Sequence, residues 1–136
     1  MTAKEYLMQY RQAARRVTAA QDHLTELRAI AERMTPSYST SGSGQPGDRL
    51  GATVARIVEA EDRLEAEIEL LIATEREIVQ TINRVSEPYR TLLYERYING
   101  KTWEQIAVIM NYSWRQTVRL HGIALNAVKD VIECHI

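Results

Sequence analysis

The sequence predicts an all-α protein in which a long antiparallel helical hairpin precedes a group of shorter helices. Two stretches repeat apolar residues in alternating steps of four and three, and a Pro/Gly/Ser-rich break separates them. The C-terminal part carries several helix-start and helix-stop signals. The chain has 136 residues, 45% hydrophobic and 26% charged, which is ordinary for one or two small globular domains.

The first periodic stretch spans residues 3–34 and ends at a predicted flexible loop. Its rhythm is typical of a coiled coil or a long amphipathic helix. The loop, residues 35–48 ("TPSYSTSGSGQPGD"), holds two prolines and three glycines. The predicted seam consists of Tyr6, Tyr10, Ala13, Val17, Ala20, Leu24, Leu27, Ala31 and Met34.

The second periodic stretch predicts the other helix and completes a hairpin domain over residues 1–85. Two glutamates, Glu61 and Glu75, fall on its stripe. Either they edge the seam and reach solvent, or they pair with arginines of the first helix and fix the register. The apolar members of the stripe are Leu50, Val54, Ile57, Leu64, Ile68, Leu71, Ile78, Ile82 and Val85.

Residues 86–136 form the second predicted domain. Pro88, with Ser86 as the cap, starts a short helix that Asn99-Gly100 ends. Two capping-box patterns follow, Thr102 with Gln105 and Ser113 with Gln116. Only Asn111 and Tyr112 lie between the first of these helices and the second cap. So short a connection predicts a helix-turn-helix.

The second helix of this pair, residues 114–133, is predicted to have distinct inner and outer faces. Its inner face holds Thr117, Leu120, Ala124, Leu125 and Val128. Its outer face holds Arg115, Val118, Arg119 and Gly122, with Trp114 at the leading edge.

The run "YRTLLYERYINGKTWEQIAVIMNYSWRQTVRLHGIAL", residues 89–125, resembles region 4 of the bacterial sigma-70 family. More closely, it resembles the small phage-encoded transcription regulators of the ArpU/RinA type, which carry such a module. The resemblance implies that the second helix enters the DNA major groove. Matched position by position, the DNA-contacting residues would be Trp114, Arg115, Gln116 and Arg119.

Further DNA contacts are expected at the helix starts, and two positions depart from the family pattern. Lys101 and the helix-end amides at Thr102 and Ser113 would touch backbone phosphate. Thr117 stands where a buried valine or isoleucine is usual, and Trp114 where a polar or basic residue is usual.

For several of these side chains two interpretations remain open. Arg115 and Arg119 are DNA contacts or solvated charges, and Gln116 reads adenine or completes the capping box with Ser113. Trp114 packs on thymine methyls or sugar, contacts a protein, or folds back on Tyr112. Lys101 contacts phosphate or serves solubility, and His121 is structural or contacts phosphate.

The expected function is that of a sequence-specific, DNA-binding phage or prophage transcription regulator. Its partners would be double-stranded DNA, RNA polymerase, and a second copy through the hairpin. One alternative is a small terminase subunit for DNA packaging. Another is an adaptor that binds RNA polymerase or a sigma factor and has no DNA specificity of its own.

Other function classes find little support in the sequence. No catalytic motif, metal-ligand spacing or cofactor loop is present, so the chain is not expected to be an enzyme. The single cysteine, Cys134, and the lack of a signal peptide or apolar span indicate the cytoplasm of a bacterial host. The formal net charge is −1, divided as −3 over residues 1–83 and +2 over residues 84–136. The C-terminal part is therefore the one suited to an anion.

Overall fold

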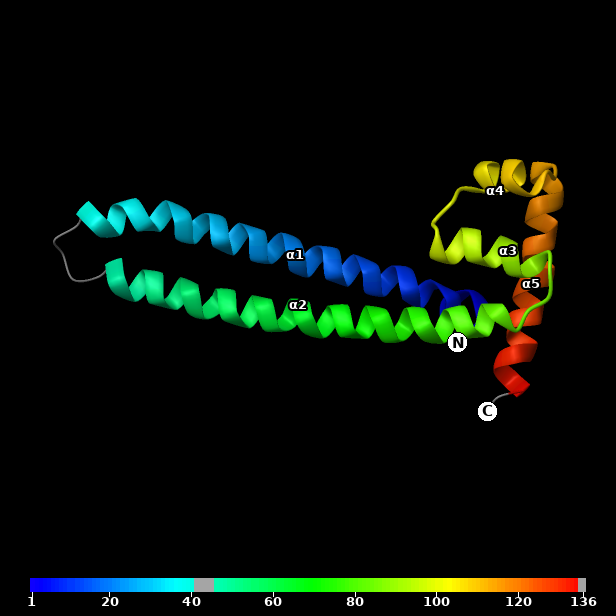
Figure 1. Ribbon diagram of the computed structural model, residues 1–136, viewed down its shortest axis with the longest axis horizontal. Coiled ribbons are helices and arrows are strands. Elements are labelled where there is room, and N and C mark those ends of the chain that lie inside the picture. Colours follow the sequence, from blue (N-terminus) through cyan, green and yellow to red (C-terminus); the bar gives the residue numbers. More distant parts are fainter. Residues whose placement is uncertain (41–45, 135–136) are drawn as a thin grey trace. The chain divides into compact units, whose positions relative to one another are not determined.

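The computed structural model describes residues 1–40 and 46–134, which fold into helices joined by turns (Figure 1). The hairpin consists of α1 (Ala3–Thr40) and α2 (Pro46–Asn83), which run antiparallel. After it come α3 (Tyr89–Leu93) and the π-helical turn η1 (Tyr94–Ile98). The last two helices are α4 (Trp103–Met110) and α5 (Trp114–Cys134). The all-α class and the long hairpin are as predicted.

The break between the hairpin helices is shorter than predicted. Helix α1 continues to Thr40 and α2 begins at Pro46, so residues 35–40 and 46–48 of the expected loop 35–48 are helical, and residues 41–45 lie outside the described residues. Pro46 occupies the first position of α2, where a missing N–H costs nothing. Serine and threonine are only moderately unfavourable in helices. A proline within α1 removes one hydrogen bond but does not forbid the helix.

The chain divides into two compact units, and their boundary differs from the expected one between residues 85 and 86. The first unit is Met1–Ala13 together with Leu71–Ile136, and the second is Ala14–Leu70. The first turns of α1 and the last turns of α2 therefore belong with the C-terminal helices. The hydrophobic periodicity continues across this boundary and so gave no sign of it.

The second unit has a narrow seam, and its residues on α2 agree only in part with the predicted stripe: Ile57 and Leu64 pack at the seam, whereas alternate positions differ. Thr53 and Ala60 are buried, whereas the neighbouring Val54 and Glu61 are exposed. Small side chains at the seam allow close approach of the two helices. The ion pairs Arg16–Glu67 (3.1 Å) and Arg28–Glu61 (3.5 Å) connect α1 with α2. The core cluster consists of Leu24, Leu27 and Ala60, with Ile57 and Leu64 packed against it.

Both interpretations of the seam glutamates apply to Glu61: it reaches solvent at the edge of the seam, and it pairs with an arginine of the first helix. Its side chain is about half exposed at the edge of the seam, and it pairs with Arg28 of α1. Such an exposed pair contributes about 0.5 kcal/mol or less, so it guides the register more than it stabilises the hairpin. Glu75 is exposed and forms no ion pair within the part of the chain that the structure describes.

The first unit has the larger core. The Tyr6 hydroxyl lies 2.9 Å from Thr81 Oγ1, which ties α1 to α2 inside this unit. The Arg11 guanidinium donates to the Arg96 carbonyl at 3.3 Å. Leu7, rather than the predicted Tyr6, is the fully buried residue of this part of α1. The core cluster contains Leu7, Ile78, Ile82, Val85, Leu92, Leu93, Tyr97, Ile106, Leu120, Ala124 and Val128.

The turns around α3 and η1 follow the sequence signals only in part. Gly100 has φ of 72°, as expected for a glycine that ends a helix, and a Cβ there would meet the Arg11 guanidinium. The expected cap by Ser86 is wrong, because Pro88 is the N-cap residue of α3 and no side chain caps it. Instead, Arg90 Nε donates to the Val85 carbonyl at 2.9 Å. Among the helices described, none combines the length and apolar character of a membrane span.

Candidate nucleic-acid interface

The connection between α4 and α5 has the predicted local structure. Thr102 and Gln105 form both bonds of the capping box that starts α4. Helix α4 ends at Asn111, whose φ of 58° is left-handed. The Tyr112 N–H then donates to the Ala107 carbonyl at 3.0 Å, and Ala107 is buried. This turn fixes where α5 begins (Figure 1).

Ser113 caps α5 without the full capping box that the sequence suggested. Its Oγ accepts the Gln116 backbone N–H at 3.1 Å. Within the described part of the chain, the Gln116 side chain returns no hydrogen bond to Ser113 and makes none elsewhere. Capping and base contact therefore do not compete for this side chain, because only the backbone of Gln116 takes part in the cap.

Thr117 is accommodated in the buried face of α5. The side chain is fully buried, and its Oγ1 donates to the Ser113 carbonyl at 2.9 Å. A buried hydroxyl with a partner carries no desolvation penalty of the kind an unpaired one would. Leu120, Ala124 and Val128 are buried along the same face, as predicted.

The opposite face of α5 is exposed, and up to Lys129 it is free of acidic residues. Trp114 is 54% exposed and Val118 37%. Arg115 and Arg119 are also exposed. Within the described ranges, the side chain of neither residue takes part in an ion pair or hydrogen bond. No aspartate or glutamate occurs between Glu104 and Asp130 in the sequence. The two guanidinium groups are therefore available to an anion or to hydrogen-bond acceptors from outside.

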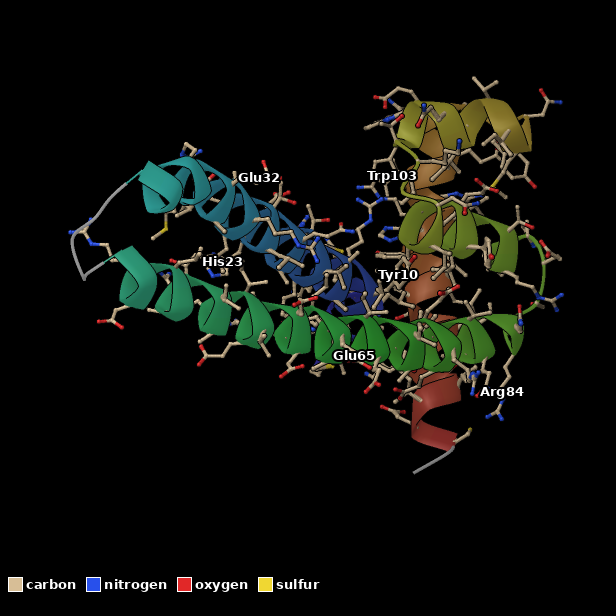
Figure 2. All side chains as sticks on the ribbon, turned by 60° about the vertical axis from the view of Figure 1, so that its left-hand side comes forward. Tyr10, His23, Glu32, Glu65, Arg84 and Trp103 are labelled. Atoms are coloured by element: carbon tan, nitrogen blue, oxygen red, sulfur yellow. The ribbon has the colours of Figure 1, made fainter. Side chains whose placement is uncertain are left out.

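His121 anchors α5 from the inner side rather than facing outward. Its Nε2 lies 2.7 Å from the Tyr97 hydroxyl, and its ring packs against Trp103 with centroids 4.5 Å apart. Arg96 lies over the Trp103 ring at 4.4 Å. Figure 2 shows Trp103 at the start of α4, next to α5. Burial, assisted by the positive charges of Lys4 and Arg96, lowers the pKa of His121 to about 4, so the imidazole is neutral at pH 7. These contacts support the structural interpretation.

Lys101 lies on a surface that the other candidate residues do not line. Its N–H donates to the Glu95 carbonyl, and its own carbonyl accepts from Arg96. Together with residues of α4 it lines a hollow of about 440 Å³. The structure thus places Ser113, Trp114, Arg115, Gln116 and Arg119 on the first turns of α5, whereas Lys101 belongs to the outer side of α4. The other residues of the hollow are Glu104, Gln105, Val108 and Ile109.

Helix α4 exposes two aliphatic side chains that the sequence reasoning did not single out. Val108 is 82% exposed and Ile109 50%. Ile106 and Ala107 are the buried residues of this helix. Four consecutive apolar residues, Ile106 to Ile109, cannot all face one side of a helix, and this was a signal for the exposed pair.

The first turns of α5 thus offer two guanidinium groups, a carboxamide and an indole to an external molecule. These groups can donate hydrogen bonds to base edges and phosphates and can stack or pack on bases. In the ranges that the structure covers, no cluster of three or more histidine, cysteine or acidic residues could hold a metal ion. No protein-family model, curated protein or solved structure matches this chain.

Proposed function

We propose that this protein is a sequence-specific DNA-binding transcription regulator of the phage or prophage type, and that α4 and α5 form its sigma-region-4-like helix-turn-helix. One observation carries the proposal: the exposed start of α5 presents Arg115 and Arg119 without internal partners, in a stretch that lacks acidic residues. In this arrangement α5 is the recognition helix, and α4 crosses the DNA backbone.

The chemistry of the face supports this assignment. Arginine bonds guanine O6 and N7 bidentately, and it also grips phosphate. Arg115 and Arg119 are four residues apart and therefore share one side of the helix. The free Gln116 carboxamide adds a group able to pair with adenine. Ser113 and the first amides of α5 form a helix N-terminus, which favours a phosphate.

The test replaces the two arginines together, Arg115→Ala with Arg119→Ala. A duplex selected from a random-sequence library with the wild-type protein serves as the probe. Each good base contact contributes about 1–3 kcal/mol, so we expect the double variant to bind the probe at least about 30-fold more weakly in a gel shift. Its circular dichroism should remain that of the wild type, because both side chains are exposed.

A matched control removes the same charge from the hairpin. Arg56 and Arg63 of α2 are exposed and form no ion pair among the residues described. The variant Arg56→Ala with Arg63→Ala should bind within about threefold of the wild type, because screening limits the effect of distant charges. Equal loss in the two double variants, or loss in neither, would contradict the proposal.

The hairpin supplies the additional contact that a regulator of this charge needs. The net charge of the chain is −1, so the general electrostatic attraction to DNA is weak. A second copy paired through the hairpin, or contact with RNA polymerase, would raise the effective affinity by linking two binding events. A DNA-binding curve that rises cooperatively with protein concentration, together with a dimer mass by light scattering, would show that a second copy supplies the additional contact.

One observation favours a second candidate function, a protein-binding adaptor. Val108 and Ile109 form an exposed aliphatic pair on α4. Exposed apolar residues of this kind occur at protein–protein contacts. If the adaptor assignment is right, the variant with Val108 and Ile109 both replaced by serine no longer captures purified RNA polymerase. The arginine double variant captures the polymerase as well as the wild type does. In addition, the wild-type protein enriches no duplex from the random-sequence library.

A further inference from the structure

We propose that α5 recognises thymine through its 5-methyl group, using Trp114 and Val118, so that the preferred DNA site carries thymines beside the bases contacted by the arginines. This inference rests on the proposed function and specifies the DNA that it reads. It assigns a role to the exposed Trp114, one of the two residues that depart from the family pattern.

Trp114 and Val118 form a continuous apolar row on the exposed side of α5. They are four residues apart, and 54% and 37% of their surfaces are exposed. Neither belongs to the core cluster of this unit. Tyr112 is packed against that core, and within the described ranges no ring contact joins it to Trp114. The indole is therefore not folded back on the turn.

The apolar row runs directly beside the basic row. Trp114 precedes Arg115, and Val118 precedes Arg119, so each aliphatic or aromatic group has a guanidinium neighbour one helical step away. A surface that binds only phosphate has no use for such an apolar row. In the major groove, the thymine C5-methyl is the apolar group that distinguishes one base pair from the others. Arginine on the adjacent row fits guanine in the same groove.

The next position of the apolar row is Gly122, which leaves space for the DNA. A Cβ at Gly122 would meet no atom of this protein within 4 Å, so no internal packing requires glycine there. A glycine in a helix interior costs about 1 kcal/mol relative to alanine. The bare backbone at this point allows a close approach to the groove wall just past Val118.

The experiment compares two random-sequence duplex libraries, one synthesised with thymine and one with uracil in its place. Uracil pairs as thymine does but lacks the 5-methyl group. From the thymine library the wild-type protein should enrich sites with one or two invariant thymines. Replacing each of these singly by uracil should weaken binding about fourfold, the value expected for burying one methyl group.

Variants then assign the methyl contacts to side chains. Each methyl contact should belong to one of the two side chains. In the variant that lacks this side chain, Val118→Ala or Trp114→Ala, replacing the contacted thymine by uracil should not weaken DNA binding any further. The matched control is Val58→Ala on α2, which removes an exposed aliphatic group that is not on α5. This control should keep the full fourfold dependence on the methyl group.

The outcomes separate the two proposals. Enrichment of specific sites that bind equally well with uracil would overturn the methyl readout and leave the DNA-binding function intact, with Trp114 and Val118 facing a protein partner. Enrichment of no sequence from either library would overturn both. A dependence on uracil that persists in Val118→Ala and in Trp114→Ala would also overturn the assignment to these residues.

Discussion

Asn111 shows how one backbone position sets the geometry of a site. Its φ of 58° requires the left-handed conformation, in which asparagine and glycine are tolerated far better than other residues. We expect Asn111→Ala to lower the free energy of unfolding by about 1 kcal/mol, and Asn111→Gly to change it by only about 0.3 kcal/mol. Urea denaturation followed by circular dichroism measures both values. An alanine variant as stable as the glycine variant would contradict this explanation of the turn.

His121 makes the stability of the molecule depend on pH. Its pKa is lowered from 6.5 to about 4 in the folded state, chiefly by burial, so the folded chain resists a proton that the unfolded chain accepts. Stability contributed by neutral His121 is complete above pH 6.5, falls as the pH drops from 6.5 to about 4, and is constant below.

The measurement compares the wild type with His121→Phe, because carboxylates also titrate near pH 4. The difference between their unfolding free energies should change steadily between pH 6.5 and 5, with the wild type losing more. His23 and His135 are present in both proteins, and their contributions cancel in the difference. A constant difference over this range would show that His121 binds its proton equally well in the folded and unfolded states, and would contradict the lowered pKa.

At the scale of single residues, the sequence predicted backbone conformations at turns and helix caps well, but it predicted side-chain contacts between distant residues poorly. Gly100 and the Thr102 cap were predicted from strong conformational preferences of their own, and the structure confirms both. The contact of His121 with Tyr97 joins residues 24 positions apart and depends on how the helices pack. No local rule contains that information.

Helix α2 has two neighbouring stripes, and only packing decides which one is buried. Sequence reasoning placed Val54, Glu61 and Ile68 on the seam, whereas Thr53 and Ala60 are buried there and Glu67 of the same row pairs with Arg16. The prediction assigned the more apolar side chains of α2 to the seam. Small side chains are favoured there instead, because they let two helices approach closely. Ile57 and Leu64 of the predicted stripe do pack at the seam, so the difference is confined to alternate positions, where the seam residue lies one position earlier than predicted.

This register leads to a prediction for two adjacent residues. Ala60→Leu inserts a large side chain into the seam and should lower the unfolding free energy by about 1–3 kcal/mol. Glu61→Leu changes an exposed position and should alter it by at most about 0.5 kcal/mol. Thermal and urea unfolding of the two variants provide the comparison. The reverse order of stability would support the register expected from the sequence.

At the scale of the whole molecule, the two compact units differ in their cores. Eleven buried residues form the core cluster of the unit that contains α3, α4 and α5, and three form that of unit Ala14–Leu70, within the part of the chain that the structure describes. Because apolar burial is the main favourable term in folding, the second unit should open more easily.

Amide hydrogen exchange tests this difference directly. Amides of residues 14–34 and 50–70 should exchange at least tenfold faster than those of α3 and the buried turns of α5, as expected for sub-global opening of the less stable unit. Ala60→Leu should accelerate exchange in the hairpin unit only. Uniform protection over the whole chain would mean that the two units unfold together.

The whole-molecule organisation was predictable only in outline. The hairpin and the C-terminal helices follow from periodicity and capping signals, which are local in sequence. The membership of residues 1–13 and 71–85 in the C-terminal unit depends on contacts such as Tyr6 with Thr81 and Arg11 with Arg96. Such contacts join the beginning of the chain to its second half, and periodicity cannot reveal them.

The different settings of the two tryptophans give the protein a built-in optical reporter. Trp103 packs against His121 under the Arg96 guanidinium, whereas Trp114 is largely open to water. An indole in water emits at longer wavelength than one shielded from it. Binding at the start of α5 should therefore shift the emission of Trp114 to shorter wavelength and leave that of Trp103 unchanged. Fluorescence of unlabelled protein can thus report when the face of α5 is covered.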